Sequence, residues 1–478
     1  MTRAAARLRA VRFPLEPGPS LDPFALAGSD GIVFRTESLV RVGLGTALSL
    51  TLADGLDDPE ALAGVMRDLR SIPVEDHVPG PGAEGLATAD GGPAGSGVVA
   101  FGSLPFDRSA EAVLRVPAIS YGADPDGSEW VTLIGEDDDG GPDLASGLAS
   151  GATGYRAWLA DLSTPRRPLG STDPPAEAAS PAPSRAHVVP RSSDDSFRSM
   201  VSEALSAIAT GALSKVVLAR QVDVTLDRPV AVPELLGRWH RLEPNCAVFS
   251  VPTPAGQFIG ASPELLVERS GPHLRSRPLA GTTRRSATDG GSAPTAGLLA
   301  SVKDGNEHRL VVEAIDRALR PLSDDLRVPD QPGLVHLHTI THLGTTITGT
   351  LDPSPEGTVP SSLELVGLLH PTPAVGGVPS TDARMLIQRL EPQSRGHYAG
   401  PVGFVDATGD GVWMVGIRSM TVEGASAVLA AGVGIVEGSD PDRELEETDL
   451  KLSAVFGALA PGHHFSTAGE RNRHEEAG

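Results

Sequence analysis

The chain has 478 residues, of which 40% are hydrophobic, so it can bury a large core without disulfides or structural metals. Its formal net charge of −22 disfavours nucleic acid and anionic membrane surfaces as partners. The one cysteine, Cys246, excludes an intramolecular disulfide and favours a cytoplasmic protein.

The first part of the chain, residues 1–163, has short β-like runs between turns. Residues 1–13 are rich in arginine but lack the apolar stretch of a secretory signal; a strand is the favoured prediction, and an organelle transit peptide is the alternative. The other strands expected here are Gly31–Phe34, Gly97–Phe101 and Trp130–Ile134, the last of which ends in an acidic turn at Glu136–Gly141.

A segment rich in proline, alanine and serine, Thr164–Arg185, divides the chain unequally. It has almost no large apolar residue and cannot pack, which predicts a linker or an insertion. The main region, residues 186–460, follows it. Residues 461–478 are predicted to be a disordered tail.

The main region alternates helical periodicity with apolar, β-branched runs. The expected helices are Ser196–Thr210, Asn306–Leu319, Thr381–Leu390 and Arg443–Ala458. The expected strands are Lys215–Thr225, Cys246–Val251, Leu265–Glu268, Val335–Ile340, Gly400–Asp406, Val412–Met420 and Ala427–Val436. Because strands outnumber helices and often follow one another through tight turns, we expect an α+β fold of large, mainly antiparallel β-sheets with helices packed outside.

Lysine occurs only at Lys215, Lys303 and Lys451, and arginine supplies the rest of the 39 positive charges. Arginine cannot act as a proton acceptor because it keeps its proton, whereas a desolvated lysine can. The three lysines are therefore candidates for a chemical role that arginine cannot fill.

Three histidines, His336, His338 and His342, share strand parity and could face one way, as zinc ligands would. A strand break would destroy that parity, and no H-E-x-x-H motif occurs. One pocket histidine and two structural ones is the favoured interpretation.

Carboxylates occur in two pairs at the starts of predicted helices. Asp304 stands three residues before Glu307, and Glu444 three residues before Glu447, so each pair presents one helix face. If the pairs converge, they suit a hard divalent cation such as Mg²⁺; the alternative is two solvated helix starts. Lys451, four residues after Glu447, could place an ammonium beside an anion held by the metal.

Nine short motifs occur in order along the main region. They are KVVLAR (Lys215–Arg220), GASPEL (Gly260–Leu265), PLAGT (Pro278–Thr282), EHRLV (Glu307–Val311), HPTPA (His370–Ala374), GPVG (Gly400–Gly403), GIR (Gly416–Arg418), AGVGIV (Ala431–Val436) and ETDLK (Glu447–Lys451). Together they resemble the chorismate-utilising enzymes, and within that family the isochorismate synthases. The match covers about Ser196–Ala458, and GSLPFD at Gly102–Asp107 extends it into the first part.

The resemblance implies that both parts of the chain form one α+β body. It also implies Mg²⁺ as cofactor and chorismate, a cyclohexadiene with two carboxylates, as substrate. The metal ligands of the family match Glu307 and Glu447, with Asp304 and Glu444 behind them. Its substrate-binding positions match Gly281, Thr282, His338, Tyr398, Arg418, Gly432, Gly434 and Lys451.

The implied reaction moves a hydroxyl group of the diene from C4 to C2, which needs a base to activate water and an acid to release hydroxide. Lys215 matches the base and Glu264 the acid. Apolar neighbours of Glu264 would keep it protonated. The implied product, isochorismate, feeds menaquinone or siderophore biosynthesis, and no obligatory protein partner is implied.

Relatives with other activities carry different residues at some of these positions. Relatives that use ammonia, such as anthranilate synthase, carry glutamine at the position of Lys215, and aminodeoxychorismate synthase carries lysine at that of Ala280; neither occurs here. Salicylate synthase, which keeps the lysine and then eliminates pyruvate, is an alternative, although Ala374 favours stopping at isochorismate. A non-catalytic chorismate-binding subunit is a further alternative, but it would need neither Lys215 nor Glu264.

Overall fold

The computed structural model describes residues 7–15, 18–77, 86–88, 96–136, 158–160, 183–285, 292–355 and 357–465. Three predicted features lie almost wholly outside these residues: the acidic turn Glu136–Gly141, the segment Thr164–Arg185 and the tail 461–478. Within the described ranges, none of the helices is both long and apolar enough to cross a membrane.

The strands of the described residues form one 14-stranded, one eight-stranded and one three-stranded sheet. The largest has the order β11 (Ala186–Pro190), β12 (Lys215–Leu226), β25 (Ser426–Ile435), β24 (Ser419–Glu423), β14 (Gly256–Ser262), β13 (Ala247–Thr253), β2 (Ile32–Arg35), β3 (Val40–Leu44), β9 (Ile119–Ala123), β10 (Glu129–Glu136), β1 (Leu8–Pro14), β5 (Val74–His77) and β6 (Leu86–Thr88), with β21 (Gly377–Val378) beside β12. Its long pairings are antiparallel, while β1 and β5 pair in parallel.

The other two sheets are antiparallel as well. The eight-stranded sheet has the order β20 (Ile347–Thr350), β16 (His273–Arg277), β15 (Leu265–Ser270), β23 (Gly411–Val415), β22 (Pro401–Asp406), β7 (Val99–Ser103), β8 (Ala112–Val116) and β4 (Leu48–Leu52). The three-stranded sheet is β17 (Leu279–Arg284), β19 (Ile340–Gly344) and β18 (Gly333–His336).

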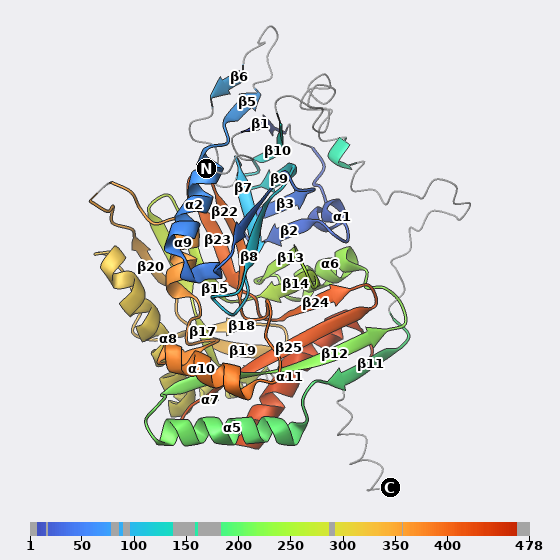
Figure 1. Cartoon of the computed structure of the whole chain (residues 1–478). Coiled ribbons are helices and arrows are strands. Elements are labelled where there is room, and N and C mark those ends of the chain that lie inside the picture. Colours follow the sequence, from blue (N-terminus) through green and yellow to red (C-terminus); the bar gives the residue numbers. More distant parts are fainter. Residues whose placement is uncertain are drawn as a thin grey trace.

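Both parts of the chain contribute to the two larger sheets. Strand β2 pairs with β13, and β7 pairs with β22, so in each of these sheets a block of strands from before Thr164–Arg185 adjoins a block from after it (Figure 1). The first part therefore shares sheets with the region that carries the motifs.

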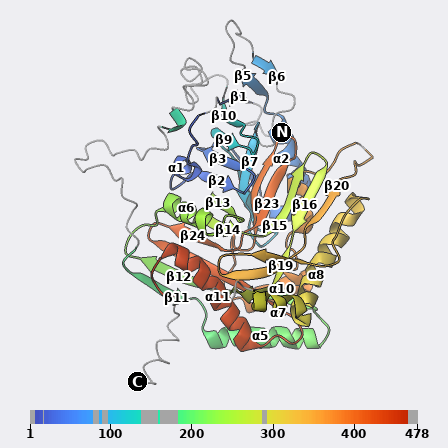
Figure 2. The same cartoon turned by 180° about the vertical axis from the view of Figure 1, so that it is seen from behind.

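Helices cover the outer faces of the sheets, with α5 and α11 along the β12–β25 end (Figure 2). The described helices are α1 (Pro23–Ala27), α2 (Pro59–Arg70), α5 (Asp194–Ala209), α6 (Val232–Leu242), α7 (Ser292–Ala300), α8 (Val302–Leu319), α9 (Ser362–Leu369), α10 (Ser380–Leu390) and α11 (Pro441–Leu459), with short 3₁₀ turns at Gly55–Asp57 and Arg320–Leu322.

Two helix starts hold the predicted carboxylates in place. Helix α8 begins after Ser301, whose hydroxyl accepts the N–H of Asp304, and α11 begins after Asp440, whose carboxylate accepts the N–H of Arg443. Such caps satisfy N–H groups that the first helical turn leaves free. Because α8 packs on β17 and α11 packs on β25, both capped ends face the same region of the sheets.

The predicted α+β class with large antiparallel sheets is confirmed, but two predicted strands are wrong. Val335–Ile340 is not one strand: β18 ends at His336, β19 starts at Ile340, and the two pair as a hairpin. Val412–Met420 divides into β23 and β24, because Arg418 between them takes a φ of 52°, which an extended strand does not allow.

Candidate active site

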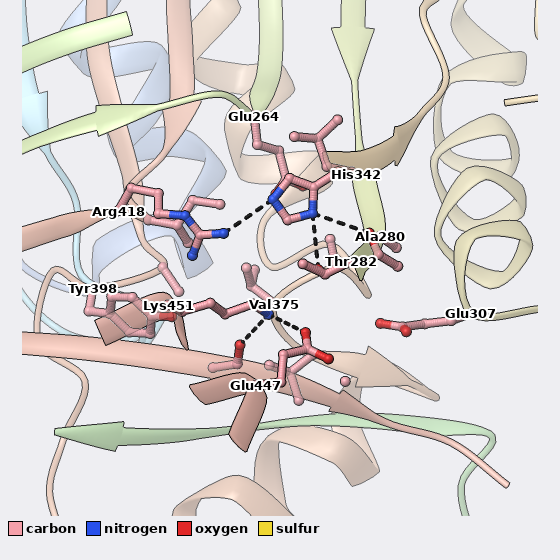
Figure 3. Close-up of a pocket in the computed structure, with 18 of the residues that line it drawn as sticks. Glu264, Ala280, Thr282, Glu307, His342, Val375, Tyr398, Arg418, Glu447 and Lys451 are labelled. Atoms are coloured by element: carbon pink, nitrogen blue, oxygen red, sulfur yellow. Dashed lines mark hydrogen bonds and ion pairs between the residues drawn. The ribbon is translucent and has the colours of Figure 1, made fainter. Parts of the chain in front are cut away.

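One cavity lies where the β12–β25 pair and the β17–β19 pair meet the N-terminal halves of α8 and α11, and Figure 3 shows residues that line it. Its charged lining residues are Glu264, Glu307, Glu447, Arg395, Arg418 and Lys451. The other lining residues are Val217, Leu279, Ala280, Gly281, Thr282, His342, Ala374, Val375, Tyr398, Ala399, Ile417, Gly432 and Gly434.

The cavity gathers most of the residues predicted to form the site, although they come from distant parts of the chain. Lys215 is fully buried and lies just behind the lining, against Glu307. Asp304 and Glu444 also stand behind the lining. His338 is the predicted residue that the structure places elsewhere.

Each of the chain's three lysines forms an ion pair with a different predicted metal-site carboxylate: Lys215 with Glu307 at 2.9 Å, Lys451 with Glu447 at 2.7 Å, and Lys303 with Glu444 at 2.6 Å, all from Nζ to Oε1. The contact of Lys215 is close but is not oriented as a hydrogen bond. The three lysines are thus concentrated around one group of carboxylates. Lys303, for which the sequence indicated no specific role, pairs with Glu444.

The carboxylates of this cluster crowd one another. Burial raises the pKa of Asp304, and the negative charges of Glu307 and Glu447 raise it further. Burial likewise raises the pKa of Glu444, with a smaller contribution from Glu447, despite the ion pair with Lys303. Excess negative charge of this kind is what a cation relieves.

The donor set suits a hard divalent cation, because its atoms are carboxylate oxygens. Within the described ranges, however, no three carboxylate, histidine or cysteine side chains are grouped closely enough to form a ready metal site. Glu307 and Glu447 are occupied by lysines instead, so binding a cation requires these two ion pairs to rearrange.

Glu264 occupies a different environment in the same cavity. It is 3% exposed, and burial raises its pKa to about 7 even though the N–H of Leu279 and the charge of Lys215 oppose the shift. Near neutral pH, therefore, a large fraction of Glu264 carries a proton that it can donate.

The pocket histidine is His342, and it binds Arg418. Nη2 of Arg418 lies 3.1 Å from Nε2 of His342, while Nδ1 of His342 faces Gly281 O at 3.2 Å and Thr282 Oγ1 at 3.1 Å (Figure 3). Because a guanidinium can only donate, Nε2 must accept and the ring proton must sit on Nδ1. Burial and Arg418 hold the pKa of His342 well below its ordinary value, so the ring is neutral.

The prediction of His338 as the pocket histidine is wrong. His338 lies in the turn between β18 and β19, where it is exposed and its backbone N–H donates to Glu243 at 3.0 Å. His342 is 6% exposed and lies inside β19, opposite Thr282. The choice of His338 followed the family resemblance; because β18 ends at His336, His338 falls in the turn and His342 in the next strand.

Glycines let charged groups approach the β25 backbone. A Cβ at Gly434 would lie 2.1 Å from Oε1 of Glu307 and 3.1 Å from Cε of Lys215, so a side chain there would displace the ion pair. Gly281 has a φ of 75°, a left-handed conformation that favours glycine. Lys451 donates to Gly432 O at 2.9 Å, which fixes the ammonium over the same strand.

Sequence reasoning missed Arg395 among the charged lining residues. Its signal was weak: Glu391 stands four residues earlier, a spacing typical of ion pairs on a helix, but Pro392 interrupts the helical pattern. His342 was noticed in the sequence but was not chosen for the pocket.

The family model for "Chorismate binding enzyme" matches residues 155–460. The chain belongs to the chorismate-binding enzyme family. The described cavity lies wholly within the matched residues, and all nine sequence motifs of the main region fall there too.

Several characterised proteins are similar to this member of the family. Isochorismate synthase DhbC of Bacillus subtilis is 39% identical over 286 residues, which cover 58% of this chain and 71% of that protein. Isochorismate synthase EntC of Escherichia coli K12 is 39% identical over 265 residues, which cover 55% of this chain and 66% of that protein.

The likeness of fold reaches further than the family match. The structure of MenF, the menaquinone-specific isochorismate synthase of Escherichia coli, superposes with a TM-score of 0.70 over 95% of this chain and 94% of that one, at 24% identity. The first part of the chain therefore keeps the fold of that protein although the family match begins only at residue 155.

Proposed function

We propose that this family member is an isochorismate synthase, which converts chorismate to isochorismate. The observation that carries the proposal is the pair of unlike groups at one cavity: the buried, partly protonated Glu264 and the buried amine of Lys215. The similarity to DhbC and EntC, both named isochorismate synthases, supports it.

The reaction needs one proton accepted and one donated. Lys215 takes a proton from water as the water oxygen bonds to C2, the double bond shifts, and the C4 hydroxyl leaves with the proton of Glu264. Water is consumed at C2 and released at C4, so the net change is an isomerisation. Lys215 can accept a proton only as a free amine, and Glu307 must therefore give up its ion pair when the site is loaded.

Glu307 and Glu447 are the proposed ligands of a divalent cation, with Asp304 and Glu444 behind them. A bound Mg²⁺ would hold the ring carboxylate of chorismate and neutralise carboxylate charge. The three ion pairs with lysine support this assignment, because they show that these carboxylates already attract positive charge.

Cationic and backbone donors are proposed to hold the two carboxylates of the substrate. Arg418 and Tyr398 are the proposed partners of the enolpyruvyl carboxylate. Lys451 and the backbone amides near Gly281, Thr282, Gly432 and Gly434 are proposed to hold the substrate's carboxylates as well. His342 keeps the guanidinium of Arg418 in place by accepting its hydrogen bond. We further propose a cytoplasmic enzyme that supplies menaquinone or siderophore biosynthesis and needs no other protein for activity.

One assay tests the proposed function. Purified protein is incubated with chorismate with and without Mg²⁺, and the products are separated by chromatography. Isochorismate formed only with Mg²⁺ is the expected result. Salicylate with pyruvate would identify a salicylate synthase, and chorismate bound without turnover would identify a binding subunit; either result would overturn the proposal.

A further inference from the structure

One edge of β12 is paired with strand backbone only at its two ends. β21 lies opposite Lys215 and Val216, and β11 lies opposite Val222–Leu226. On this edge, residues 217–221 between them face no partner strand within the described part of the chain, although they are buried; β25 pairs with them on the other edge. The N–H and C=O groups that point to this edge need other partners, because unpaired polar groups in a protein interior are costly.

A buried ion pair fills this gap in the sheet. Nη2 of Arg395 donates to Val217 O at 2.8 Å, and Oε1 of Glu391 accepts the N–H of Ala219 at 2.9 Å. Arg395 and Glu391 hold each other through Nε and Oε2 at 2.8 Å, and their side chains are 1% and 5% exposed. The two side chains thus supply the donor and acceptor that a neighbouring strand would.

The same guanidinium reaches the loop that carries the HPTPA motif. Nη1 of Arg395 donates to Val375 O at 2.7 Å, and Val217 N–H donates to Gly376 O at 2.7 Å beside it. The ring of Phe106 lies 4.2 Å from the guanidinium carbon, which fixes its plane. Val217 and Val375 both line the cavity, as does Tyr398, which follows Arg395 by three residues.

The two arginines of the cavity differ in how many of their N–H groups already bind protein acceptors. Four of the five N–H groups of Arg395 are directed at Val375, Val217 and Glu391. Among the described residues, the side chain of Arg418 makes one hydrogen bond, to His342. Its other N–H groups make none there. Arg418 can bind a substrate carboxylate, whereas Arg395 is committed to holding protein segments together.

We propose that the Glu391–Arg395 pair is a positioning element for substrate binding: it replaces a strand along β12 and thereby fixes the wall formed by Val217, Val375 and Tyr398. The inference rests on the proposed function, because it assigns that wall to chorismate. Arg395 acts through the wall and needs no contact with the reacting atoms.

The test compares Glu391→Gln, Arg395→Lys, Arg395→Met and the double variant Glu391→Gln with Arg395→Met. Arg395→Lys keeps the charge but cannot reach three acceptors at once. Arg389→Met is the matched control, because Arg389 lies in the last turn of α10, the helix that Glu391 caps at its C-terminus, and pairs with Glu203 at the surface. KM for chorismate, kcat at saturating Mg²⁺ and Tm are measured on the full chain.

We expect KM to rise about tenfold or more in each single variant of the pair, because misplaced binding groups lose affinity steeply. The double variant should be no worse than the poorer single variant, and Arg389→Met should stay within twofold of wild type. KM within twofold of wild type in folded Glu391→Gln and Arg395→Lys, with only a lower Tm, would reduce the pair to a structural role and overturn the inference.

Two further measurements keep the outcome clear. If Arg395→Met does not fold, the near-isosteric Glu391→Gln decides. If the wild-type protein binds chorismate but does not turn it over, the proposed function fails, and the Kd for chorismate in the same variants takes the place of KM; an unchanged Kd then refutes the positioning role.

Discussion

Two glutamates of one cavity, Glu264 and Glu447, are held in opposite protonation states by their neighbours. Glu264 is buried, has no ion-pair partner among the described residues, and its pKa rises to about 7. Burial also acts on Glu447, but the ion pair with Lys451, the charge of Lys303 and the hydroxyl of Thr282 together outweigh it and bring the pKa below its ordinary value. The same side chain thus serves as an acid on one side of the cavity and as a permanent anion on the other.

The largest expected effect comes from the base that complements Glu264. Lys215→Ala should lower kcat by about 10³-fold, within the range that a positioned base contributes. Circular dichroism of the variant checks that the fold is kept. A variant that retains wild-type kcat would show that Lys215 is a bystander.

The second prediction tests the contrast between the two glutamates by the pH dependence of folding stability. The folded-state pKa of Glu264 lies above the ordinary value of 4.5, so folded protein holds the extra proton and loses stability as pH rises from 4.5 to 7. Replacement by glutamine removes this loss. The stability of Glu264→Gln relative to wild type should therefore increase by about 3 kcal/mol between pH 4.5 and pH 8.

Glu447→Gln should show the reverse sign. The lowered pKa of Glu447 means that its anion stabilises the fold at pH 8, and that this contribution disappears as pH falls through the folded-state pKa. The variant should be less stable than wild type at pH 8, should lose Mg²⁺-dependent turnover, and should approach wild-type stability in acid. Urea titrations at several pH values measure both variants, and equal pH dependence in the two would contradict the contrast.

A smaller effect tests the close contact behind the cavity. Gly434→Ala should lower kcat/KM about tenfold or more, because the added Cβ displaces Glu307 and with it the partner of Lys215. Gly457→Ala is the control: it lies in α11 with open space around it, and it should stabilise the helix by up to about 1 kcal/mol without changing activity. Equal kinetics in the two variants would mean that the Glu307 position is unimportant.

The smallest expected effect is a pH dependence of kcat/KM that arises from the proposed acid, Glu264. Only protonated Glu264 can donate, and with a pKa of about 7 its protonated fraction falls about fivefold between pH 7 and pH 8. We expect kcat/KM to fall accordingly in this range unless a second group compensates. The residual kcat/KM of Glu264→Gln should not fall between pH 7 and pH 8. If the fall persists in the variant, it is due to another residue.

Local patterns were enough to predict the elements that carry the chemistry. The apolar, β-branched run from Lys215 and the amphipathic helices beginning near Asp304 and Glu444 match β12, α8 and α11, because their periodicity reflects which face is buried. The motifs then indicated which side chains meet, although the strands that bring them together are far apart in the sequence.

What failed depended on backbone turns and long-range pairing. The turn at residues 337–339 lies among β-branched and apolar residues that favour a strand, so the position of the turn was not predicted, and the resemblance was matched to His338 in place of His342. The role of Arg395 depends on two backbone groups of β12, more than 170 residues away, and no local spacing encodes that distance.

The addition of water at C2 is the central claim, and isotope labelling tests it most directly. Purified protein, Mg²⁺ and chorismate are incubated in water enriched in ¹⁸O, and isochorismate is analysed by mass spectrometry at early time points. Our account predicts one ¹⁸O atom in the C2 hydroxyl of each product molecule. Isochorismate that forms without the label would contradict it, since the hydroxyl would then have migrated within the substrate.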